Sequence, residues 1–209
     1  MKGALLFAFN NPTVDYFEMA NYTAKRINRF LDIPVSVVTD NNTDISKYQQ
    51  NFDNIYVQDS DKSNIKNNQV WINKGRYKAF EITPYDETLV IDTDYMVNSN
   101  RLLSVFDMYD DFMCHDTTGH LFYPDLPLEK VSNNSFRTLW ATVMFFKKSN
   151  RTRQIFECMK MVQENYTHYV NLYNMTSTMF RNDYALTIAL RTVNGQIETK
   201  EDYIPWKLK

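Results

Sequence analysis

The sequence predicts an α/β protein in which a mixed central sheet is flanked by helices. Apolar runs long enough for buried strands alternate with segments whose apolar residues recur at helical spacing, and this rhythm is typical of a layered α/β sheet. Several of the runs end in a polar or acidic residue, as at Asn10, Asp40 and Asp92. Because ligands of open α/β sheets bind beyond the carboxyl ends of the strands, the same pattern predicts where a site would lie.

The first half of the chain contains the clearest elements. Apolar runs predict strands at 3–9, 34–40, 54–58 and 88–94. Helical spacing predicts helices at 13–31, 71–83 and 100–109, the first of them beginning near Pro12 or Thr13. The segment 42–53 is interpreted as a short helix or a loop, and 59–69 is polar enough to be an exposed loop.

The second half is less regular. Residues 110–138 form a long, turn-rich connection, with a short strand expected near 111–115, and insertions of this length often carry function. A strand over 139–149, a long amphipathic helix over 151–173 and a helix over 182–193 follow. Asn182 stands where it could cap the last helix.

Composition and charge bound the class of protein. With 209 residues, of which 44% are hydrophobic and 15% aromatic, the chain suits one globular domain. Its net charge of −2 gives no global argument for a polyanionic partner. Cys114 and Cys158 are too few for a disulfide scaffold or a cysteine zinc site, so we expect buried free thiols in a reducing compartment.

The expected cellular location of the protein follows from its apolar segments. The run is short for a signal peptide and is interpreted as a first strand. No stretch approaches the ~20 apolar residues of a transmembrane helix. We therefore expect no membrane segment and a cytoplasmic protein.

The stretch "TLVIDTD" raises the question of function. Strand alternation would send Asp92 and Asp94, two residues apart, to the same side of the strand, where their charges repel unless a cation lies between them. A hard divalent ion held by one or two carboxylates keeps positions free for phosphate oxygens and can neutralise the charge of a departing diphosphate. The competing interpretation is a solvated acidic turn.

Beyond this pair, the stretch "YKAFEITPYDETLVIDTDYMVNSNRLLSVFD" resembles the central signature of GT-A glycosyltransferases, particularly family 8, in which a helix with a basic residue leads into a strand and an "LDxD" motif. The resemblance covers roughly residues 1–195 in layout, with specific motifs at about 71–107 and weaker ones at 139–147 and 181–190. It implies a Rossmann-like sheet, Mn²⁺ or Mg²⁺, a nucleotide diphosphate sugar as donor (a UDP-sugar before others), and transfer to an acceptor hydroxyl. It also implies one GT-A-like domain over 1–209, divided into a donor-binding part (1–107) and an acceptor-side part (108–209).

Transferred onto this sequence, the resemblance assigns roles to residues that follow the early strands. Asp94 would be the surer metal ligand, and Asp92 would lie near the metal and the donor ribose or sugar. Phe9 and Asn10 match the loop that meets the nucleotide base, and Asp40 matches an acid that accepts a hydrogen bond from that base. As structural alternatives, Asn10 is a turn residue before Pro12 and Asp40 a strand-end acid.

Further assignments fall on the helix before the motif and on the last helix. Asn73, Arg76 and Lys74 match polar residues that reach the diphosphate or sugar of the donor, and a solvated helix face is the alternative. In "FRNDYALTIAL", Asp183 corresponds to an acid near the transferred sugar, with Asn182 beside it, and a helix N-cap pair is the alternative. We therefore expect Asp183 and Arg76 to be the catalytic residues.

Two departures from the family pattern stand out. Trp140, Ala141 and Thr142 replace the expected Asn and Gly at the start of the strand, which leaves the acceptor geometry open. The C-terminal His-containing metal motif is also missing, since no His follows His168. His115 or His120 could supply a third ligand, although each also fits an ordinary loop residue.

Two other functions compete with this one. A haloacid-dehalogenase-type aspartyl phosphatase also uses an apolar strand followed by D-x-D, but Tyr95 and Met96 fit its pattern poorly. A non-catalytic protein that binds a nucleotide sugar or another ligand would share the scaffold. The basic cluster Lys147, Lys148, Arg151 and Arg153 is either a solvated turn or a polyanion contact.

The compact, Asn-rich style is similar to bacteriophage transferases, some of which glycosylate modified DNA bases, so the acceptor is either a glycan or modified DNA.

Overall fold

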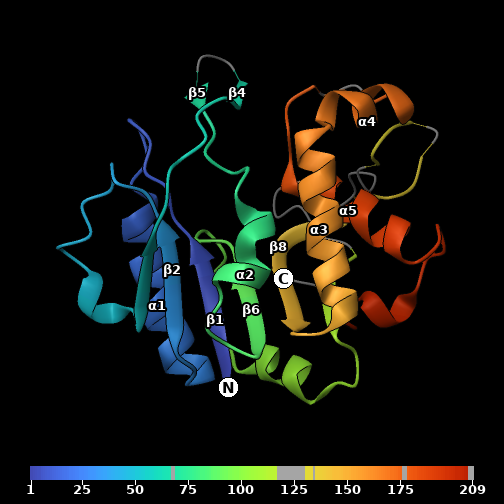
Figure 1. Ribbon diagram of the computed structural model, residues 1–209. Helices are drawn as coiled ribbons and strands as arrows, with labels where there is room; N and C mark the ends of the chain where they lie inside the picture. Colours follow the sequence, from blue (N-terminus) through green and yellow to red (C-terminus); the bar gives the residue numbers. More distant parts are fainter. Residues whose placement is uncertain (67–68, 117–129, 134, 176–177, 207–209) are drawn as a thin grey trace.

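A computed structural model describes residues 1–209 apart from 67–68, 117–129, 134, 176–177 and 207–209. Its main sheet has six strands in the order β3-β2-β1-β6-β8-β7, and helices lie on both faces of this sheet (Figure 1). The mixed α/β class predicted from the sequence is confirmed. The strands are β1 (Lys2–Phe7), β2 (Val35–Thr39), β3 (Asn54–Val57), β6 (Glu87–Ile91), β7 (Phe112–His115) and β8 (Trp140–Lys147).

The direction of the strands brings the predicted polar residues to one edge. Strands β1, β2, β3 and β6 are parallel, whereas β8 is antiparallel to both β6 and β7. The register pairs Phe7 with Val38 and Leu6 with Ile91, so the residues that follow these strands lie along the same carboxyl edge. A small hairpin, β4 (Ile65–Lys66) and β5 (Gln69–Val70), projects above this edge (Figure 1).

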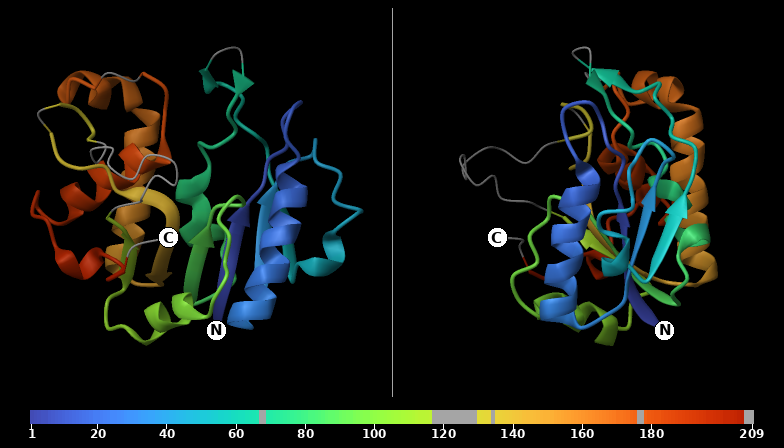
Figure 2. Two further views of the ribbon diagram at one scale, coloured as in Figure 1. Left: turned by 180° about the vertical axis from the view of Figure 1, so that it is seen from behind. Right: turned by 90° about the vertical axis from the view of Figure 1, so that its left-hand side faces the viewer.

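Two layers of helices bury the sheet. On one face α1 (Tyr16–Leu31) and the 3-10 helix η3 (Arg101–Asp107) cover the apolar side chains that alternate with those of the other face. The opposite face is covered by α2 (Ala79–Ile82), α3 (Asn150–Glu164) and α5 (Asn182–Val193) (Figure 2). The α4 helix (Tyr166–Leu172) continues from α3 and packs beside α5 in a third apolar cluster.

Capping residues fix where the two longest helices begin. The Asp15 side chain accepts a hydrogen bond from the Glu18 N–H, so α1 starts three residues after Thr13, where a start was predicted. In α3, Ser149 and Thr152 form a reciprocal capping box. Neither cap contributes to the predicted site, but both helices hold the faces of the sheet that surround it.

Several predicted elements differ from those observed. The helix expected at 71–83 is only a 3-10 turn, η2 (Arg76–Lys78), followed by the four-residue α2, and the segment predicted as the loop 59–69 contains β4 and the start of β5. The helix predicted at 100–109 is the 3-10 helix η3, and the one predicted at 151–173 is interrupted at Asn165. His120 and most of the long connection lie outside the described residues.

Candidate active site at the carboxyl edge of the sheet

Arg76 and Asp92 form an ion pair at the end of β6. Asp92 follows Ile91, the last residue of the strand, and its N–H donates to the Thr142 carbonyl at 2.8 Å, which continues the pairing of β6 with β8. One Arg76 nitrogen, Nη2, contacts Asp92 Oδ1, while Nη1 donates to the Ala141 carbonyl at 2.6 Å. The η2 turn thus places the guanidinium between a carboxylate and the main chain of β8.

Asp183 forms a hydrogen bond with Ala141, the residue whose carbonyl accepts from Arg76. The Ala141 N–H donates to Asp183 Oδ1 at 2.9 Å, so the amide and the carbonyl of Ala141 connect Asp183 to Arg76. We call these two hydrogen bonds the Ala141 link. Through it, residues far apart in the sequence, on η2, β8 and α5, meet beside Asp92. The two residues predicted as catalytic are therefore brought together.

Arg181 holds Asp183 from the helix side. Its Nη2 and Nε lie 3.0 and 3.3 Å from Asp183 Oδ2, and its guanidinium stands 4.9 Å from the ring centroid of Tyr184 and 5.9 Å from that of Trp140. Asp183 therefore has one oxygen on a main-chain amide and the other on a cation. A carboxylate bound in this way is positioned and charge-balanced rather than free to act as a nucleophile.

The electrostatics of Asp92 follow from its burial. Burial raises the pKa of this carboxyl, the Arg76 charge and hydrogen bond oppose the shift, and the nearby charge of Asp94 adds to it. A hydrogen bond from the Thr142 side chain also favours the charged form of Asp92. The two acids of the motif are thus close enough to repel each other, as expected from their spacing.

Asp94 lies in a different environment. The strand ends at Ile91, and the Tyr95 N–H donates to the Asp92 carbonyl at 3.0 Å, which closes a turn over 92–95. Strand alternation therefore does not reach Asp94, so it gives no reason for the two side chains to align, and their alignment stays a prediction. Asp94 is exposed, and its charge, after burial, contributes to a raised pKa of Tyr16 at the start of α1.

The donor set of this edge fits a hard divalent cation. Within the described residues no group of three or more His, Cys, Asp or Glu side chains could hold a metal ion. Asp94 and Asp92 would therefore be the protein ligands, and the other positions would go to phosphate oxygens and water. Mg²⁺ at nucleotide sites is commonly bound in this way, by one or two carboxylates and substrate phosphates.

His115, one candidate for a third ligand, does not fit that role. It is fully buried at the end of β7, opposite Trp140, and neither ring nitrogen has a hydrogen-bond partner in the described structure. Burial lowers the pKa of His115 to about 4. It belongs to no ligand group with Asp92 and Asp94 in the part of the chain that is described. The other candidate, His120, lies outside the described residues.

The residues predicted to meet the nucleotide base also have local structural roles. Asn10 Oδ1 accepts from the Phe17 N–H at 2.9 Å and so orients the first turn of α1. Asp40 is buried, and its oxygens accept from the amides of Asn42 and the hydroxyl of Thr43. These hydrogen bonds, with one from Ser60, outweigh burial and lower the pKa of Asp40. A contact with a base remains a prediction for both residues.

Phe9 and Lys74 line a small cavity of about 70 Å³ beside β1. Lys74 does not point freely into it, because its ammonium donates to Ser63 Oγ at 2.6 Å and lies 3.6 Å from Asp61. Gly75 also borders the cavity, immediately before Arg76. Gln163 of α3 lines the cavity as well, so the cavity lies on the face covered by α3.

Asn73 and Asn182 join the projecting hairpin segment to α5. The Asn182 side chain donates to the Asn73 carbonyl at 2.9 Å, and Asn64 donates to the Asn73 side chain at the same distance. The predicted capping role of Asn182 is wrong, because Arg181 is the N-cap residue and no side-chain cap is formed. Asn182 instead fixes the segment that precedes Arg76.

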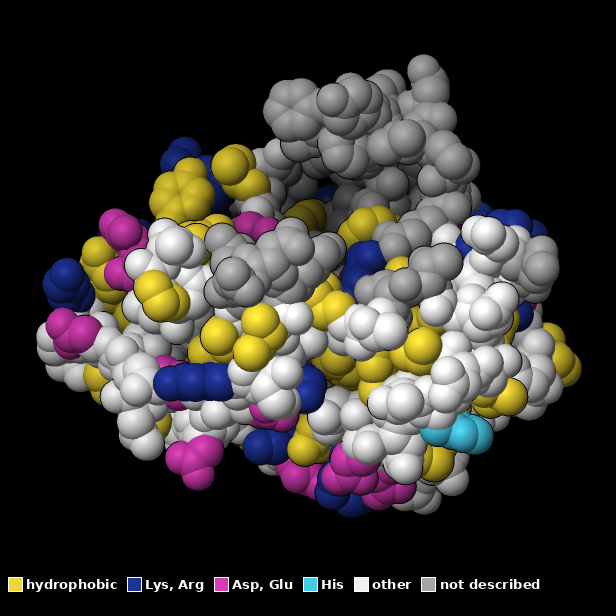
Figure 3. Space-filling model, turned by 90° about the horizontal axis from the view of Figure 1, so that it is seen from above, with side chains coloured by type: hydrophobic (Ala, Val, Ile, Leu, Met, Phe, Trp, Pro, Cys, Tyr) yellow, Lys and Arg dark blue, Asp and Glu magenta, His cyan; other side chains and the backbone are white. Residues whose placement is uncertain are grey.

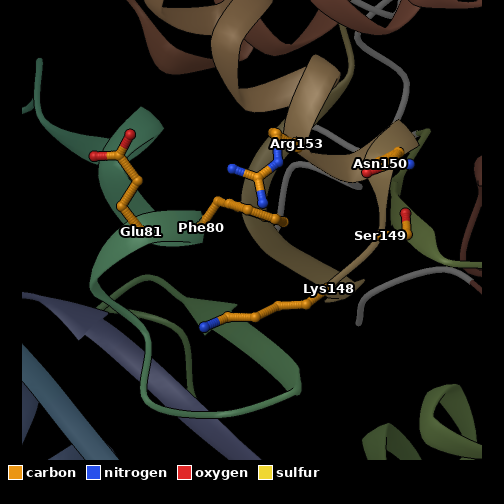
Figure 4. Close-up of a pocket in the computed structure, with 6 residues that line it drawn as sticks. All are labelled: Phe80, Glu81, Lys148, Ser149, Asn150 and Arg153. Atoms are coloured by element: carbon orange, nitrogen blue, oxygen red, sulfur yellow. The ribbon is translucent and has the colours of Figure 1, made fainter.

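The basic cluster is separate from this edge and is largely occupied. Arg151 pairs with Asp111 at 2.8 Å and with Asp202 at 2.5 Å, and Lys147 donates to the Met108 carbonyl. In a pocket at the opposite edge of the sheet, Lys148 extends toward the loop after α2 and Arg153 lies against Phe80, while Glu81 points away (Figure 4). These contacts favour the structural interpretation of the cluster over a polyanion contact.

Charge is also dispersed over the carboxyl edge. Seen from above, hydrophobic side chains lie between isolated groups of Lys, Arg, Asp and Glu, with no extended basic region on the described part of this face (Figure 3). Among the residues that the structure describes, no helix has the length and apolar character needed to span a membrane.

Sequence reasoning missed the residues that connect the site. Ala141 acts through its main chain, so no side-chain signal could have identified it. Arg181 precedes Asn182 and Asp183 directly, and a basic residue beside two predicted site residues was an available signal. Thr142, whose side chain forms a hydrogen bond with Asp92, was noted only as part of a departure from the family pattern, and Tyr16, whose pKa is raised by burial and by the Asp94 charge, only as a member of a helix.

The architecture is similar to that of solved glycosyltransferases. LgtC, a galactosyltransferase solved with donor and acceptor sugar analogues, matches with a TM-score of 0.57 and 15% identity over 91% of this chain and 70% of LgtC. GlyE of Streptococcus pneumoniae TIGR4 matches with a TM-score of 0.54 and 12% identity over all of this chain but only 45% of GlyE. Mouse xyloside xylosyltransferase 1 has a TM-score of 0.54 and 9% identity, over 94% of this chain and 84% of the mouse protein.

These comparisons establish the fold. The chain has the GT-A fold predicted from the sequence, with a six-stranded central sheet flanked by helices. No protein-family model matches the chain, and no curated protein matches it. The activity is therefore inferred from the site.

Proposed function

We propose that the protein is a glycosyltransferase that moves a sugar from a nucleotide diphosphate sugar to an acceptor hydroxyl. The observation that carries the proposal is the Ala141 link, which joins Arg76 and Asp183 beside Asp92 at the carboxyl edge of the sheet. The sequence predicts all three as site residues. The similarity of the fold to solved glycosyltransferases supports the same conclusion.

Each residue has a role that follows from its surroundings. Asp94 and Asp92 would hold Mn²⁺ or Mg²⁺, which supplies charge neutralisation for the leaving diphosphate. Arg76, fixed by the Ala141 carbonyl, would place its guanidinium against diphosphate or sugar oxygens, where a planar fork of donors matches the acceptor geometry. Asp183, bound through both oxygens, would orient the donor sugar by accepting from its hydroxyl groups.

Binding experiments with nucleotides test the donor. A thermal-shift panel of UDP, GDP, CDP and their sugars, with and without Mn²⁺, should show a metal-dependent rise of the melting temperature for one nucleotide. We expect UDP to give this rise. A panel without any metal-dependent shift would contradict the proposal.

A turnover assay separates an enzyme from a binding protein on the same scaffold. Incubation with the donor selected by the panel should release nucleoside diphosphate at a slow rate without acceptor, through hydrolysis, and faster when an acceptor glycan is supplied. Binding without release under any of these conditions would favour the non-catalytic alternative. DNA that contains hydroxymethylated bases is a second acceptor to include in the assay.

A further inference from the structure

Arg76 is a constrained cation. Its Nη1 is bound to the Ala141 carbonyl, its Nη2 is bound to Asp92, and its buried Nε–H has no hydrogen-bond partner in the described structure. Only 12% of the side chain is exposed. The guanidinium therefore has N–H donors to spare, the buried Nε–H among them, and little freedom to leave the edge of the sheet.

Asp92 already has a counter-ion in this arrangement. Arg76 occupies Oδ1, and the Thr142 side chain adds a further hydrogen bond to the carboxylate. The exposed fraction of the Asp92 side chain is 25%. Asp94, by contrast, is exposed and has no ion pair with a described residue. A divalent cation could therefore reach Asp94 more easily than Asp92.

The charge of Arg76 opposes a cation at this position. An ion that reached both carboxylates would stand within a few ångströms of the guanidinium, and like charges in a partly desolvated site repel strongly. A bound diphosphate would make the binding of the cation favourable, because the diphosphate oxygens attract both the ion and the guanidinium. The Ala141 carbonyl would keep Arg76 near those oxygens after it releases Asp92.

We propose that Arg76 makes the binding of a divalent cation conditional on the donor's diphosphate. In the free protein the guanidinium neutralises Asp92 and weakens the cation site. When a diphosphate is bound, Arg76 has a second anionic partner, and its charge no longer weakens the binding of the cation. This inference rests on the proposed function, because it assumes that the donor's diphosphate binds beside Asp92 and Asp94.

Metal titrations without any nucleotide test the first half of the proposal. The affinity for Mn²⁺ alone is measured by electron paramagnetic resonance for the wild type, for Arg76→Gln and for Arg29→Gln. Arg29 is an exposed residue in the last turn of α1, at the opposite edge, so its substitution removes the same charge without touching the site. Arg76→Gln should bind Mn²⁺ about tenfold more tightly, and Arg29→Gln should match the wild type.

A second titration with UDP tests the coupling. In the wild type, UDP should tighten Mn²⁺ binding strongly, whereas in Arg76→Gln the ratio of the affinities with and without UDP should fall. Asp92→Asn completes a double-mutant cycle: in that background, Arg76→Gln should tighten Mn²⁺ binding less than it does when Asp92 is present, because the carboxylate that Arg76 neutralises is gone and only the repulsion between the guanidinium and the ion remains. Far-ultraviolet circular dichroism establishes that each variant is folded.

The outcomes separate this inference from the proposed function. Mn²⁺ affinity that is unchanged or weaker in folded Arg76→Gln overturns the inference, whatever the nucleotide does. A wild type that binds Mn²⁺ but no UDP, GDP or CDP contradicts the proposed function, and the first titration then still reports on Arg76 and Asp92. Tightening in Arg76→Gln that is equally large in the Asp92→Asn background also overturns the inference, because the effect would not act through Asp92.

Discussion

The side chain of Asn182 donates a hydrogen bond to the main-chain carbonyl of Asn73 at 2.9 Å. This contact crosses 109 positions of the sequence and joins the first residue of α5 to the segment that leads into Arg76. The buried Asn64 reinforces it, with one hydrogen bond to the Asn73 side chain and one to the Phe180 carbonyl. The position of Arg76 therefore depends on amide side chains that carry no charge.

Substitution of Asn182 should loosen this segment. Asn182→Ala removes the donor to Asn73, and we expect a loss of about 1 kcal/mol in the free energy of unfolding, which is typical of one hydrogen bond. Hydrogen exchange should accelerate in the segment 64–75 and leave β1 unchanged. Asn28→Ala, at an exposed position of α1, is the matched control. Equal exchange in the two variants would show that the contact does not hold the segment.

The two acids of the motif should respond differently to neutralisation. Asp92→Asn leaves the Arg76 guanidinium buried without a counter-ion, so we expect a loss of about 2 kcal/mol in the free energy of unfolding. Asp94→Asn changes an exposed side chain and should stay within about 0.5 kcal/mol of the wild type. Urea denaturation measures both. Metal-dependent binding of UDP should be lost in each variant, because each removes a charged ligand.

The reverse pattern would contradict the assigned environments. If Asp94→Asn were the more destabilised variant, Asp94 would have a structural partner that the present geometry does not give it. If it kept metal-dependent UDP binding, the role of Asp94 as a metal ligand would be wrong.

Much of the fold was predictable because the central strands are buried and mostly apolar. All five residues of β2 are buried, as are the last four of β6, so continuous hydrophobic runs identified both. The short 3-10 helices η2 and η3 were predicted as α-helices, because apolar spacing does not distinguish one tight turn from several. The hairpin β4–β5 was missed because strands of two residues leave no periodic signal.

The site was predictable only where its residues act through side chains of recognisable chemistry. Asp92, Arg76 and Asp183 were identified and do meet at one edge. What joins them is the backbone of Ala141, and the position of a backbone group follows from tertiary pairing rather than from residue type. Asp94 was correctly placed near Asp92, but the turn after Ile91 could not be derived from strand alternation.

Neutralisation of Asp183 should lower the turnover number of the proposed reaction without preventing the protein from folding. Asp183→Asn keeps an oxygen for the Ala141 N–H but removes the charge that binds Arg181, so the protein should fold while the turnover number of the proposed reaction falls by about 100-fold. The Michaelis constant for the donor should change little. Asp183→Ala leaves the Ala141 amide without an acceptor and should also lower the free energy of unfolding by about 1 to 2 kcal/mol.

Steady-state kinetics and urea denaturation on the same preparations measure this difference. An Asp183→Asn variant with an unchanged turnover number would show that the charge of Asp183 has no part in transfer. One that raises only the Michaelis constant would make Asp183 a donor-binding residue.

His115 should make stability depend on pH in the acidic range. Burial lowers its pKa in the folded state to about 4, against an ordinary value of 6.5. Between these values the unfolded chain binds a proton that the folded chain does not, so the free energy of unfolding should fall as the pH drops from about 6.5 to about 4 and level off below. The full effect corresponds to about 3 kcal/mol.

Two variants isolate that contribution. His115→Phe keeps a ring in the buried position and removes both unpartnered nitrogens, so the slope between pH 6.5 and 4 should flatten relative to the wild type. His168→Gln, at an exposed position of α4, should leave the slope unchanged. Chemical denaturation at a series of pH values gives the comparison. A slope that His115→Phe does not alter would mean that the acid sensitivity arises from carboxylates such as those paired with Arg151, and not from the buried imidazole.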